Sequence, residues 1–266
     1  MESIKGRYAV VTGASGGIGL EFCRVLARKG CNLLMVAIED ELLEQRAMEI
    51  REQHGVEALP LTLDLTDPRA PERVIAFMEA RGIEPYILTN NAGIFSFSPV
   101  LEHSGGKLDR FIDLHVRATT QLCRVVAERM KANGGGRILN MSSMSCWTPM
   151  PGITMYSATK AYIRVFSRAL HYELRDSGVS VTVACPGGIA TDLFGLPENL
   201  RRLAVRIGVL DLPDRFAGKA VKRMLKGRKQ YINGPLNRLS IFLVGITPTP
   251  VRMMVKRRML DRGVRV

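Results

Sequence analysis

The stretch RYAVVTGASGGIG, residues 7–19, decides the fold. Its β-branched first half predicts a strand, and apolar residues at helical spacing follow in residues 18–28. The glycines between them let the chain turn tightly and let a phosphate approach the unpaired N–H groups of the helix start. The spacing differs from G-x-G-x-x-G, so the stretch taken alone also fits a glycine-rich turn without a ligand.

Strand and helix continue to alternate beyond this stretch. Further strands are expected at residues 31–37, 58–65, 85–89, 137–142, 179–185 and 230–233. Helices are expected at residues 39–53, 70–80, 105–131, 155–176 and 214–226. Strands that lack in–out alternation and are separated by helices are typical of a parallel sheet buried on both faces. The sequence therefore predicts an α/β fold with a Rossmann-like, doubly wound parallel sheet.

The length and composition fit one folded domain. The 266 residues are 46% hydrophobic and 24% charged, which excludes a disordered or fibrous chain. No repeat or low-complexity linker interrupts the pattern. We expect a dinucleotide-binding and catalytic domain in residues 1–234, with residues 235–266 as a basic, apolar extension of the same domain.

The five cysteines are scattered and never form a C-x-x-C pair. This pattern indicates neither a disulfide framework nor a structural zinc site, and the histidines also lack metal-ligand spacing. Residues 1–11 do not resemble an export leader. We therefore expect a cytoplasmic protein that binds no metal.

The net charge of +13 comes entirely from the last part of the chain. Residues 1–194 hold 21 basic and 21 acidic residues, whereas residues 195–266 hold 17 basic and 4 acidic ones. Cations beside the apolar run at residues 239–246 are typical of a segment that contacts an anionic membrane surface. A packed tail with a solvated basic face is the alternative. Nucleic acid is not expected, because aromatic residues are not interleaved with the basic ones.

Four more motifs lie at predicted strand ends or at the start of a helix. They are Asn90-Asn91-Ala92-Gly93, Ser143, the pair Tyr156 and Lys160 in Y-x-x-x-K, and Pro186-Gly187. In this order, and with thirteen residues from Ser143 to Tyr156, the chain resembles the short-chain dehydrogenase/reductase family over about residues 5–194. The resemblance points to the lipid- and steroid-active ketoreductases.

The resemblance implies a nicotinamide dinucleotide as cofactor. It places the cofactor diphosphate at the glycine turn, the adenine at the third strand, and the nicotinamide beside the second half of the sheet. Asp64 also fits a helix cap or an Asx turn. The implied cofactor-binding residues are Gly13, Ser15, Gly17, Ile18, Gly19, Asp64, Leu65, Asn91, Ala92, Gly93, Tyr156, Lys160, Pro186, Gly187, Ile189 and Thr191.

The choice between NADP(H) and NAD(H) depends on the end of the second strand. That place reads Ala37-Ile38-Glu39, without the acid usual in NAD enzymes or the arginine common in NADP enzymes. Glu39 fits a ribose hydroxyl and equally fits an acid in the first turn of a helix. We expect NADP(H) or NAD(H), with a lean to NADP(H) from the likeness to lipid-active reductases.

The expected catalytic residues are Ser143, Tyr156, Lys160 and His115. Tyr156 and Lys160 are four residues apart on a helix, so the ammonium lies near the phenol and is expected to favour the phenolate. Tyr156 would then exchange a proton with the substrate oxygen, while Ser143 donates a hydrogen bond to it. Relatives have an asparagine where this chain has His115, which fits either a proton relay or a space-filling side chain.

Apolar segments flank these residues, namely 94–97, 150–155 and 193–196. They favour a hydrophobic carbonyl or alcohol as the substrate, lipid-like or steroid-like. The alternative function is a non-catalytic dinucleotide-binding sensor or scaffold whose basic tail contacts an anionic surface. The resemblance also implies a homo-oligomer that associates through the two long helices.

Overall fold

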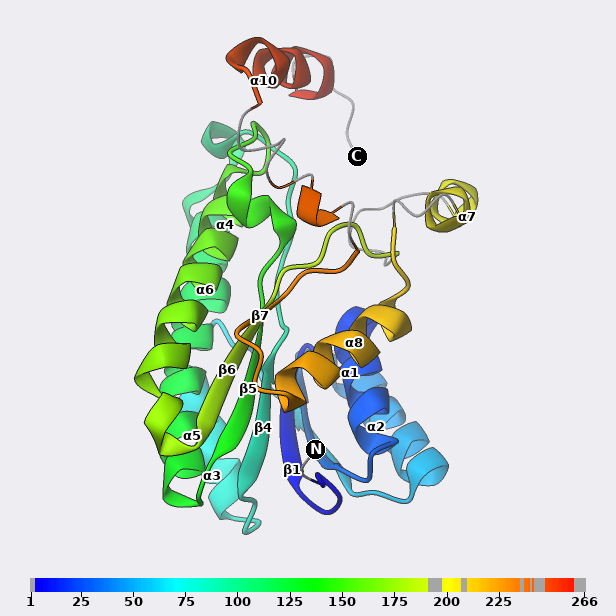
Figure 1. Cartoon of the computed structure of the whole chain (residues 1–266), viewed down its shortest axis with the longest axis vertical. Coiled ribbons are helices and arrows are strands. Elements are labelled where there is room, and N and C mark those ends of the chain that lie inside the picture. Colours follow the sequence, from blue (N-terminus) through cyan, green and yellow to red (C-terminus); the bar gives the residue numbers. More distant parts are fainter. Residues whose placement is uncertain are drawn as a thin grey trace.

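Seven parallel strands form one sheet in the order β3-β2-β1-β4-β5-β6-β7 (Figure 1). The structure is a computed structural model and describes residues 3–190, 198–206, 210–234, 237–239, 241 and 247–260. The strands are β1 (Tyr8–Thr12), β2 (Asn32–Ala37), β3 (Ala58–Thr62), β4 (Pro85–Asn90), β5 (Gly136–Met141), β6 (Val179–Ala184) and β7 (Gln230–Tyr231).

Helices cover both faces of the sheet, as Figure 1 shows. One face carries α1 (Gly17–Ala27), α2 (Asp40–His54) and α8 (Pro213–Leu225). The other carries α3 (Ala70–Glu79), α5 (Thr119–Ala132) and α6 (Thr154–Glu173). Each layer buries its own apolar cluster, and Phe22 of α1 meets Phe216 of α8 edge to face at 6.5 Å. The predicted doubly wound parallel sheet is confirmed.

The order of the strands places a crevice above β1 and β4. These strands are neighbours, yet the chain leaves them toward opposite halves of the sheet. Their carboxyl ends therefore open a crevice between diverging loops, which is where open α/β sheets bind ligands. Gly13 follows β1 and Asn91 follows β4, so the two motifs meet at this crevice.

Two predicted elements differ from the structure. The expected helix at 105–131 is divided into α4 (Gly105–Phe111), the π-helical turn η2 (Ile112–Ala118) and α5. The wide turn lies where the fully buried His115 makes its hydrogen bonds. The expected strand at 58–65 ends at Thr62, because the chain turns at Asp64.

Short elements complete the upper end of the molecule in Figure 1. They are η1 (Val100–Glu102), η3 (Met144–Trp147), α7 (Glu198–Arg206), α10 (Thr249–Val255) and η6 (Lys256–Leu260), and η4 (Arg175–Ser177) follows α6. Among the described residues, no helix has the length and apolar character needed to cross a bilayer.

Candidate active site

The glycine turn after β1 exposes backbone to the crevice. Gly13 and Gly17 have φ of +66° and +53°, in the left-handed region that favours glycine. A Cβ at Gly16 or Gly17 would meet nothing within 4 Å, whereas one at Gly19 would lie 1.9 Å from the carbonyl oxygen of Gly13. The helix start therefore packs tightly on the turn, while its outer side stays open to a ligand.

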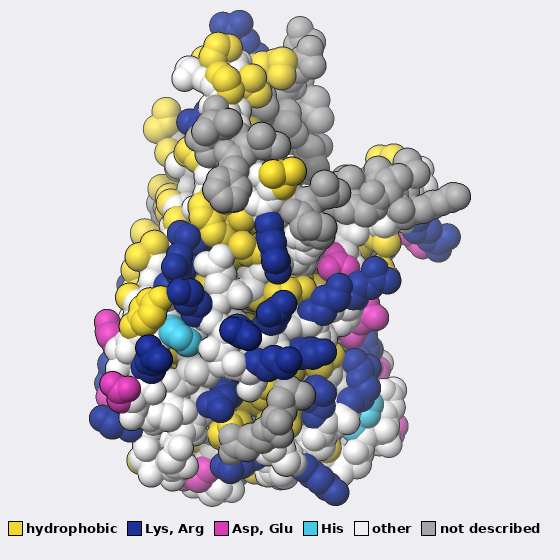
Figure 2. All heavy atoms as spheres, in the orientation of Figure 1, with side chains coloured by type: hydrophobic (Ala, Val, Ile, Leu, Met, Phe, Trp, Pro, Cys, Tyr) yellow, Lys and Arg dark blue, Asp and Glu magenta, His cyan; other side chains and the backbone are white. Residues whose placement is uncertain are grey.

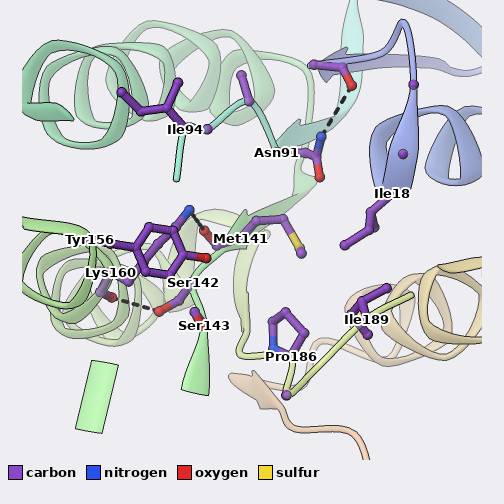
Figure 3. Close-up of a pocket in the computed structure, with 16 residues that line it drawn as sticks. Ile18, Asn91, Ile94, Met141, Ser142, Ser143, Tyr156, Lys160, Pro186 and Ile189 are labelled. Carbon is purple, nitrogen blue, oxygen red and sulfur yellow. Dashed lines mark hydrogen bonds between the residues drawn. The ribbon is translucent and has the colours of Figure 1, made fainter. Parts of the chain in front are cut away.

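Two hollows lie along the crevice and share the lining residues Gly13, Ala92, Gly93 and Ile94. The larger, of about 340 Å³, runs from the glycine turn to Tyr156 (Figure 3). The smaller, of about 150 Å³, extends to the ends of β2 and β3. Because they share a wall, they form one groove across the carboxyl end of the sheet.

The groove brings together most of the residues expected from the sequence. Its larger hollow is lined by Gly13, Gly17, Ile18, Asn91, Ala92, Gly93, Ser143, Tyr156, Lys160, Pro186, Gly187 and Ile189. The smaller hollow adds Ser15, Asp64 and Leu65. Gly19 and His115 lie behind the wall, and Thr191 lies outside the described residues.

Asn91 ties the two central strands together at the crevice. Its side-chain Nδ2 donates to the carbonyl oxygens of Thr12 at 3.1 Å and Gly13 at 3.3 Å. The backbone N–H groups of Asn91 and Ala92 both donate to the Thr12 hydroxyl at 3.0 Å. The shape of the groove floor is therefore fixed by side-chain contacts across β1 and β4.

The end of the groove at β2 carries a positioned carboxylate. The Ser15 hydroxyl donates to Glu39 Oε2 at 2.7 Å, so Glu39 faces the glycine turn and does not cap its own helix. The Asp64 carboxylate accepts hydrogen bonds from the backbone N–H and the hydroxyl of Thr66, so Asp64 forms the expected Asx turn. Asp64 also lines the groove. Arg110 lines the same hollow and, together with the hydrogen bonds from Thr66, its charge helps to lower the pKa of Asp64.

Tyr156 points its hydroxyl into the larger hollow (Figure 3). Burial raises the pKa of the phenol, and a hydrogen bond with Ser143 opposes that rise. The expectation that Lys160 would draw the phenol toward ionisation is therefore wrong in direction, because burial raises the pKa of Tyr156. The phenol is protonated at neutral pH and can donate a proton.

Lys160 lies under the Tyr156 ring with its ammonium fully enclosed. Its Nζ is 5.6 Å from the ring centroid and donates to the Met141 carbonyl at 2.9 Å. The Ser142 hydroxyl donates to the Lys160 carbonyl at 2.7 Å, which anchors this turn of α6 to the end of β5. Burial lowers the pKa of Lys160 to about 8.

His115 lies directly behind Gly93, with both ring nitrogens occupied. The Ile94 N–H donates to Nε2 at 3.0 Å, so Nδ1 carries the proton and donates to the Thr159 hydroxyl at 2.8 Å. The Thr159 hydroxyl donates onward to the Met155 carbonyl at 2.9 Å. Burial, together with the Lys160 charge, holds the pKa of His115 well below 6.5, so the ring is neutral.

An apolar wall stands beside the reacting residues. The Phe95 ring meets the Tyr156 ring edge to face at 5.1 Å, and Ile18 and Ile189 lie across the hollow from Tyr156 (Figure 3). Phe97 packs against Gly152. Leu193, Phe194 and Leu196, which were also expected on this side, lie outside the described residues.

Sequence reasoning missed several side chains of this site. Thr159 and Ser142 hold the catalytic elements by hydrogen bonds, and Arg110 lines the far end of the groove. The adjacency of Ser142 to Ser143 and of Thr159 to Lys160 was the one available signal. Among the residues that the structure describes, no group of three metal-ligating side chains occurs.

The comparisons with known proteins agree with this geometry. The family model for short chain dehydrogenases matches residues 7–198. The very-long-chain 3-oxoacyl-CoA reductase of Anas platyrhynchos is 35% identical over 228 residues, covering 80% of this chain and 72% of that protein. The probable oxidoreductase EphD of Mycobacterium tuberculosis is 34% identical over 184 residues, covering 69% of this chain. The match spans only 31% of that longer protein.

Solved structures extend the likeness to nearly the whole chain. A 7β-hydroxysteroid dehydrogenase superposes with a TM-score of 0.84 at 28% identity, covering 96% of this chain and 97% of that one. A short-chain dehydrogenase from Sphingobium yanoikuyae in complex with NADPH gives 0.76 at 28% identity, covering 91% and 96%. The chain therefore belongs to the short chain dehydrogenase family and is an NAD(P)-dependent oxidoreductase.

Proposed function

We propose that this protein transfers hydride between a nicotinamide dinucleotide and a hydrophobic ketone or secondary alcohol. The observation that carries the proposal is the Tyr156 hydroxyl, which points into the groove that Ser143 also lines and stays protonated at neutral pH because burial raises its pKa. A phenol and a second hydroxyl at one point can bind a carbonyl oxygen and protonate it as negative charge develops.

The groove fits a dinucleotide. Gly16 and Gly17 leave the start of α1 open, no side chain caps that helix, and its first turn holds no acid, so its N–H groups are available to a diphosphate. Pro186, Gly187 and Ile189 line the same hollow as Tyr156, where the nicotinamide would lie. When bound, the dinucleotide supplies or accepts the hydride.

The residues of the chain handle the proton and the geometry. In the direction of reduction, Ser143 and Tyr156 hold the carbonyl oxygen, and Tyr156 gives up its proton. Lys160 places a positive charge beside the phenolate that remains, which stabilises it. His115 is a positioning residue, because its neutral ring fixes the Gly93-Ile94 backbone and the Thr159 turn of α6.

The apolar wall supports a lipid-like or steroid-like substrate. Phe95 packs against the reacting phenol itself, so a substrate at Tyr156 must touch aromatic surface. Two of the similar proteins have names that point the same way, a very-long-chain 3-oxoacyl-CoA reductase and a 7β-hydroxysteroid dehydrogenase. The proposed substrates are therefore 3-oxoacyl thioesters and alicyclic ketones.

Glu39 is proposed as the residue that sets the relative affinity for NAD(H) and NADP(H). The similarity to a dehydrogenase solved in complex with NADPH supports NADP(H) as a cofactor. The carboxylate held by Ser15 fits a ribose hydroxyl as hydrogen-bond acceptor and repels a 2′-phosphate. Arg110, which lines the same hollow, carries the positive charge that would offset this repulsion.

The test is a fluorescence titration with NADH and NADPH, followed by turnover assays with the preferred one. A medium-chain 3-oxoacyl thioester and a decalone represent the proposed substrates, and a keto sugar of similar size is the control. We expect dinucleotide binding and turnover of the apolar ketones. Faster turnover of the keto sugar would overturn the substrate class, and absence of dinucleotide binding would overturn the whole proposal.

We also propose peripheral contact with an anionic membrane through α10. Val251, Met253 and Met254 are 40–44% exposed there, and Lys256 and Arg257 follow them. Figure 2 shows apolar side chains at this end and Lys and Arg side chains over the face below. Flotation with anionic and with neutral liposomes tests the contact, comparing the full chain with a chain stopped after Pro235. Equal flotation of both chains would remove the proposal.

A homodimer through α5 and α6 is the proposed assembly. Tyr162, Val165 and Tyr172 leave the outer side of α6 apolar and 38–61% exposed. Light scattering of the wild type and of Val165→Asp tests this face, with a shift toward monomer expected for the variant. A dimer that persists unchanged would place the interface elsewhere.

A further inference from the structure

Two cysteines that the reaction does not use lie beside the catalytic serine. Cys146 is in η3, three residues after Ser143, and Cys185 follows β6 immediately before Pro186. Backbone hydrogen bonds join the two segments, from Ser142 N to the Ala184 carbonyl and from Met144 N to the Pro186 carbonyl, both at 2.8 Å. The two cysteines are therefore held together by neighbouring strand ends of the sheet.

Their side chains are neighbours in the fold. Each thiol shifts the pKa of the other, and the Ser142 hydroxyl lowers the pKa of both. Around them, Cys146 packs against the buried cluster of Ile163, Val183 and Cys185. The packing therefore places the two thiols on neighbouring side chains, where a disulfide forms once η3 and the end of β6 move together.

The two thiols differ in access and in chemistry. Cys146 is partly exposed and lines a hollow between η3, the start of α6 and α10, whereas Cys185 is buried. The hydrogen bond from Cys185 lowers the pKa of the Cys146 thiol, and the nearby Arg164 also favours its thiolate. The same contact raises the pKa of Cys185. This is the pattern of an attacking cysteine with a resolving partner.

The other cysteines lack these features. Cys23, Cys31 and Cys123 are fully buried. Burial raises the pKa of the thiols of Cys31 and Cys123 to about 12, so neither forms a thiolate at neutral pH. Cys31 thus provides a matched negative control within the same chain.

We propose that Cys146 and Cys185 form a reversible redox modification site, oxidised to an intramolecular disulfide by hydrogen peroxide. The Cys146 thiolate attacks one peroxide oxygen, which gives a sulfenic acid and releases the other oxygen as water. The Cys185 thiol then attacks the sulfenic sulfur, forms the S–S bond and releases a second water. Both sulfurs are oxidised, both peroxide oxygens are reduced, and a dithiol reverses the reaction.

Closing this bond alters the active site. The sulfurs must approach to about 2.05 Å, which draws η3 toward the end of β6. Ser143 caps η3, with its hydroxyl accepting from the Ser145 N–H at 3.1 Å, so it moves with that turn. We expect turnover to fall about tenfold or more on oxidation, because small displacements of reacting groups are costly. This consequence depends on the proposed function, whereas the disulfide itself does not.

The experiment treats the full chain with hydrogen peroxide, blocks free thiols and maps tryptic peptides without reduction. Residues 138–160 and 176–201 are separate tryptic peptides that each contain one of the two cysteines. The expected product is these peptides joined and lighter by two hydrogens, together with loss of ketone reduction that a dithiol restores. Cys31→Ala should behave as the wild type.

Cys146→Ser and Cys185→Ala separate the outcomes. Both should give no joined peptide and should keep turnover after peroxide treatment. The proposal is overturned if Cys146 is oxidised without linking to Cys185, or if Cys146→Ser loses activity in peroxide as the wild type does. If the joined peptide forms in a protein that reduces no ketone, the redox site stands and the proposed function fails.

Discussion

His115 offers a prediction whose size can be worked out from the structure. In His115→Ala, the Ile94 N–H loses its acceptor and the Thr159 hydroxyl loses a donor. An orphaned buried N–H costs about 1–3 kcal/mol, and a lost neutral hydrogen bond costs about 1 kcal/mol. His115→Gln removes the imidazole but keeps an amide oxygen that can accept from Ile94. We therefore expect the alanine variant to be less stable than the glutamine variant.

The pH dependence separates a neutral, enclosed ring from one that exchanges protons. The pKa of His115 in the folded protein lies well below 6.5, so below about pH 6.5 the unfolded chain binds a proton that the folded protein does not. Folding stability is then lost as the pH falls. Between about pH 7.5 and pH 5.5, the wild type should lose about 1 kcal/mol more than His115→Gln.

The assay is urea unfolding followed through the fluorescence of Trp147, the one tryptophan of the chain. The difference in unfolding free energy between the wild type and His115→Gln should shrink as the pH is lowered. A constant difference across this range would refute the neutral, doubly bonded imidazole. A shift in the pH profile of kcat in His115→Gln would also refute the positioning role and restore the proton relay.

Three further predictions concern the groove. Glu39→Gln keeps an acceptor for Ser15 but removes the negative charge at the β2 end, so the ratio of NADPH to NADH affinity, measured by fluorescence titration, should rise about tenfold. Glu41→Gln, exposed in the first turn of α2, is the control and should leave this ratio unchanged. Gly19→Ala puts a Cβ 1.9 Å from the carbonyl oxygen of Gly13, so dinucleotide affinity and the unfolding free energy should both fall. Gly218→Ala, with open space around it, should retain both, and equal values for the two variants would refute the tight packing of the turn. In the folded protein the pKa of Lys160 is about 8, against 10.5 in the unfolded chain, so between these pH values the unfolded chain holds one more proton. The unfolding free energy of the wild type should therefore rise with pH relative to that of Lys160→Met, by about 3 kcal/mol at most, and parallel pH curves in urea unfolding would contradict the burial of a charged lysine.

The strand-and-helix pattern was predictable because it depends on local periodicity. Apolar runs such as residues 32–37 are buried on both faces in the structure, as a parallel sheet requires. The π-helical turn around His115 was not predictable, since its apolar spacing continues that of the flanking helices. Its cause is a set of hydrogen bonds to Ile94 and Thr159, which are distant in sequence.

The members of the site were predictable but their ionisation was not. The motifs at strand ends necessarily meet at one edge of a parallel sheet, so Ser143, Tyr156 and the glycine turn were expected together. The sequence showed Lys160 one helical turn from Tyr156, and from this we expected an easily ionised phenol. Burial decides the direction instead, and burial depends on residues such as Phe95 that only the fold brings to the ring.

The proximity of Cys146 and Cys185 could not be predicted from the sequence either. The two cysteines are separated by α6 in sequence, and nothing in their spacing indicates a pair. The pairing of β5 with β6 brings the two cysteines together, because Met141 and Ala184 are in register and the chain continues past the sheet edge after each of them.

The most direct test of Tyr156 as the proton donor is a single-turnover experiment with Tyr156→Phe. The enzyme is preloaded with reduced dinucleotide and mixed with an apolar ketone, and loss of dinucleotide fluorescence is followed. We expect the variant to bind dinucleotide as tightly as the wild type and to transfer hydride at least about a hundredfold more slowly. Hydride transfer at the wild-type rate in Tyr156→Phe would show that the phenol is not the proton donor and would contradict the account.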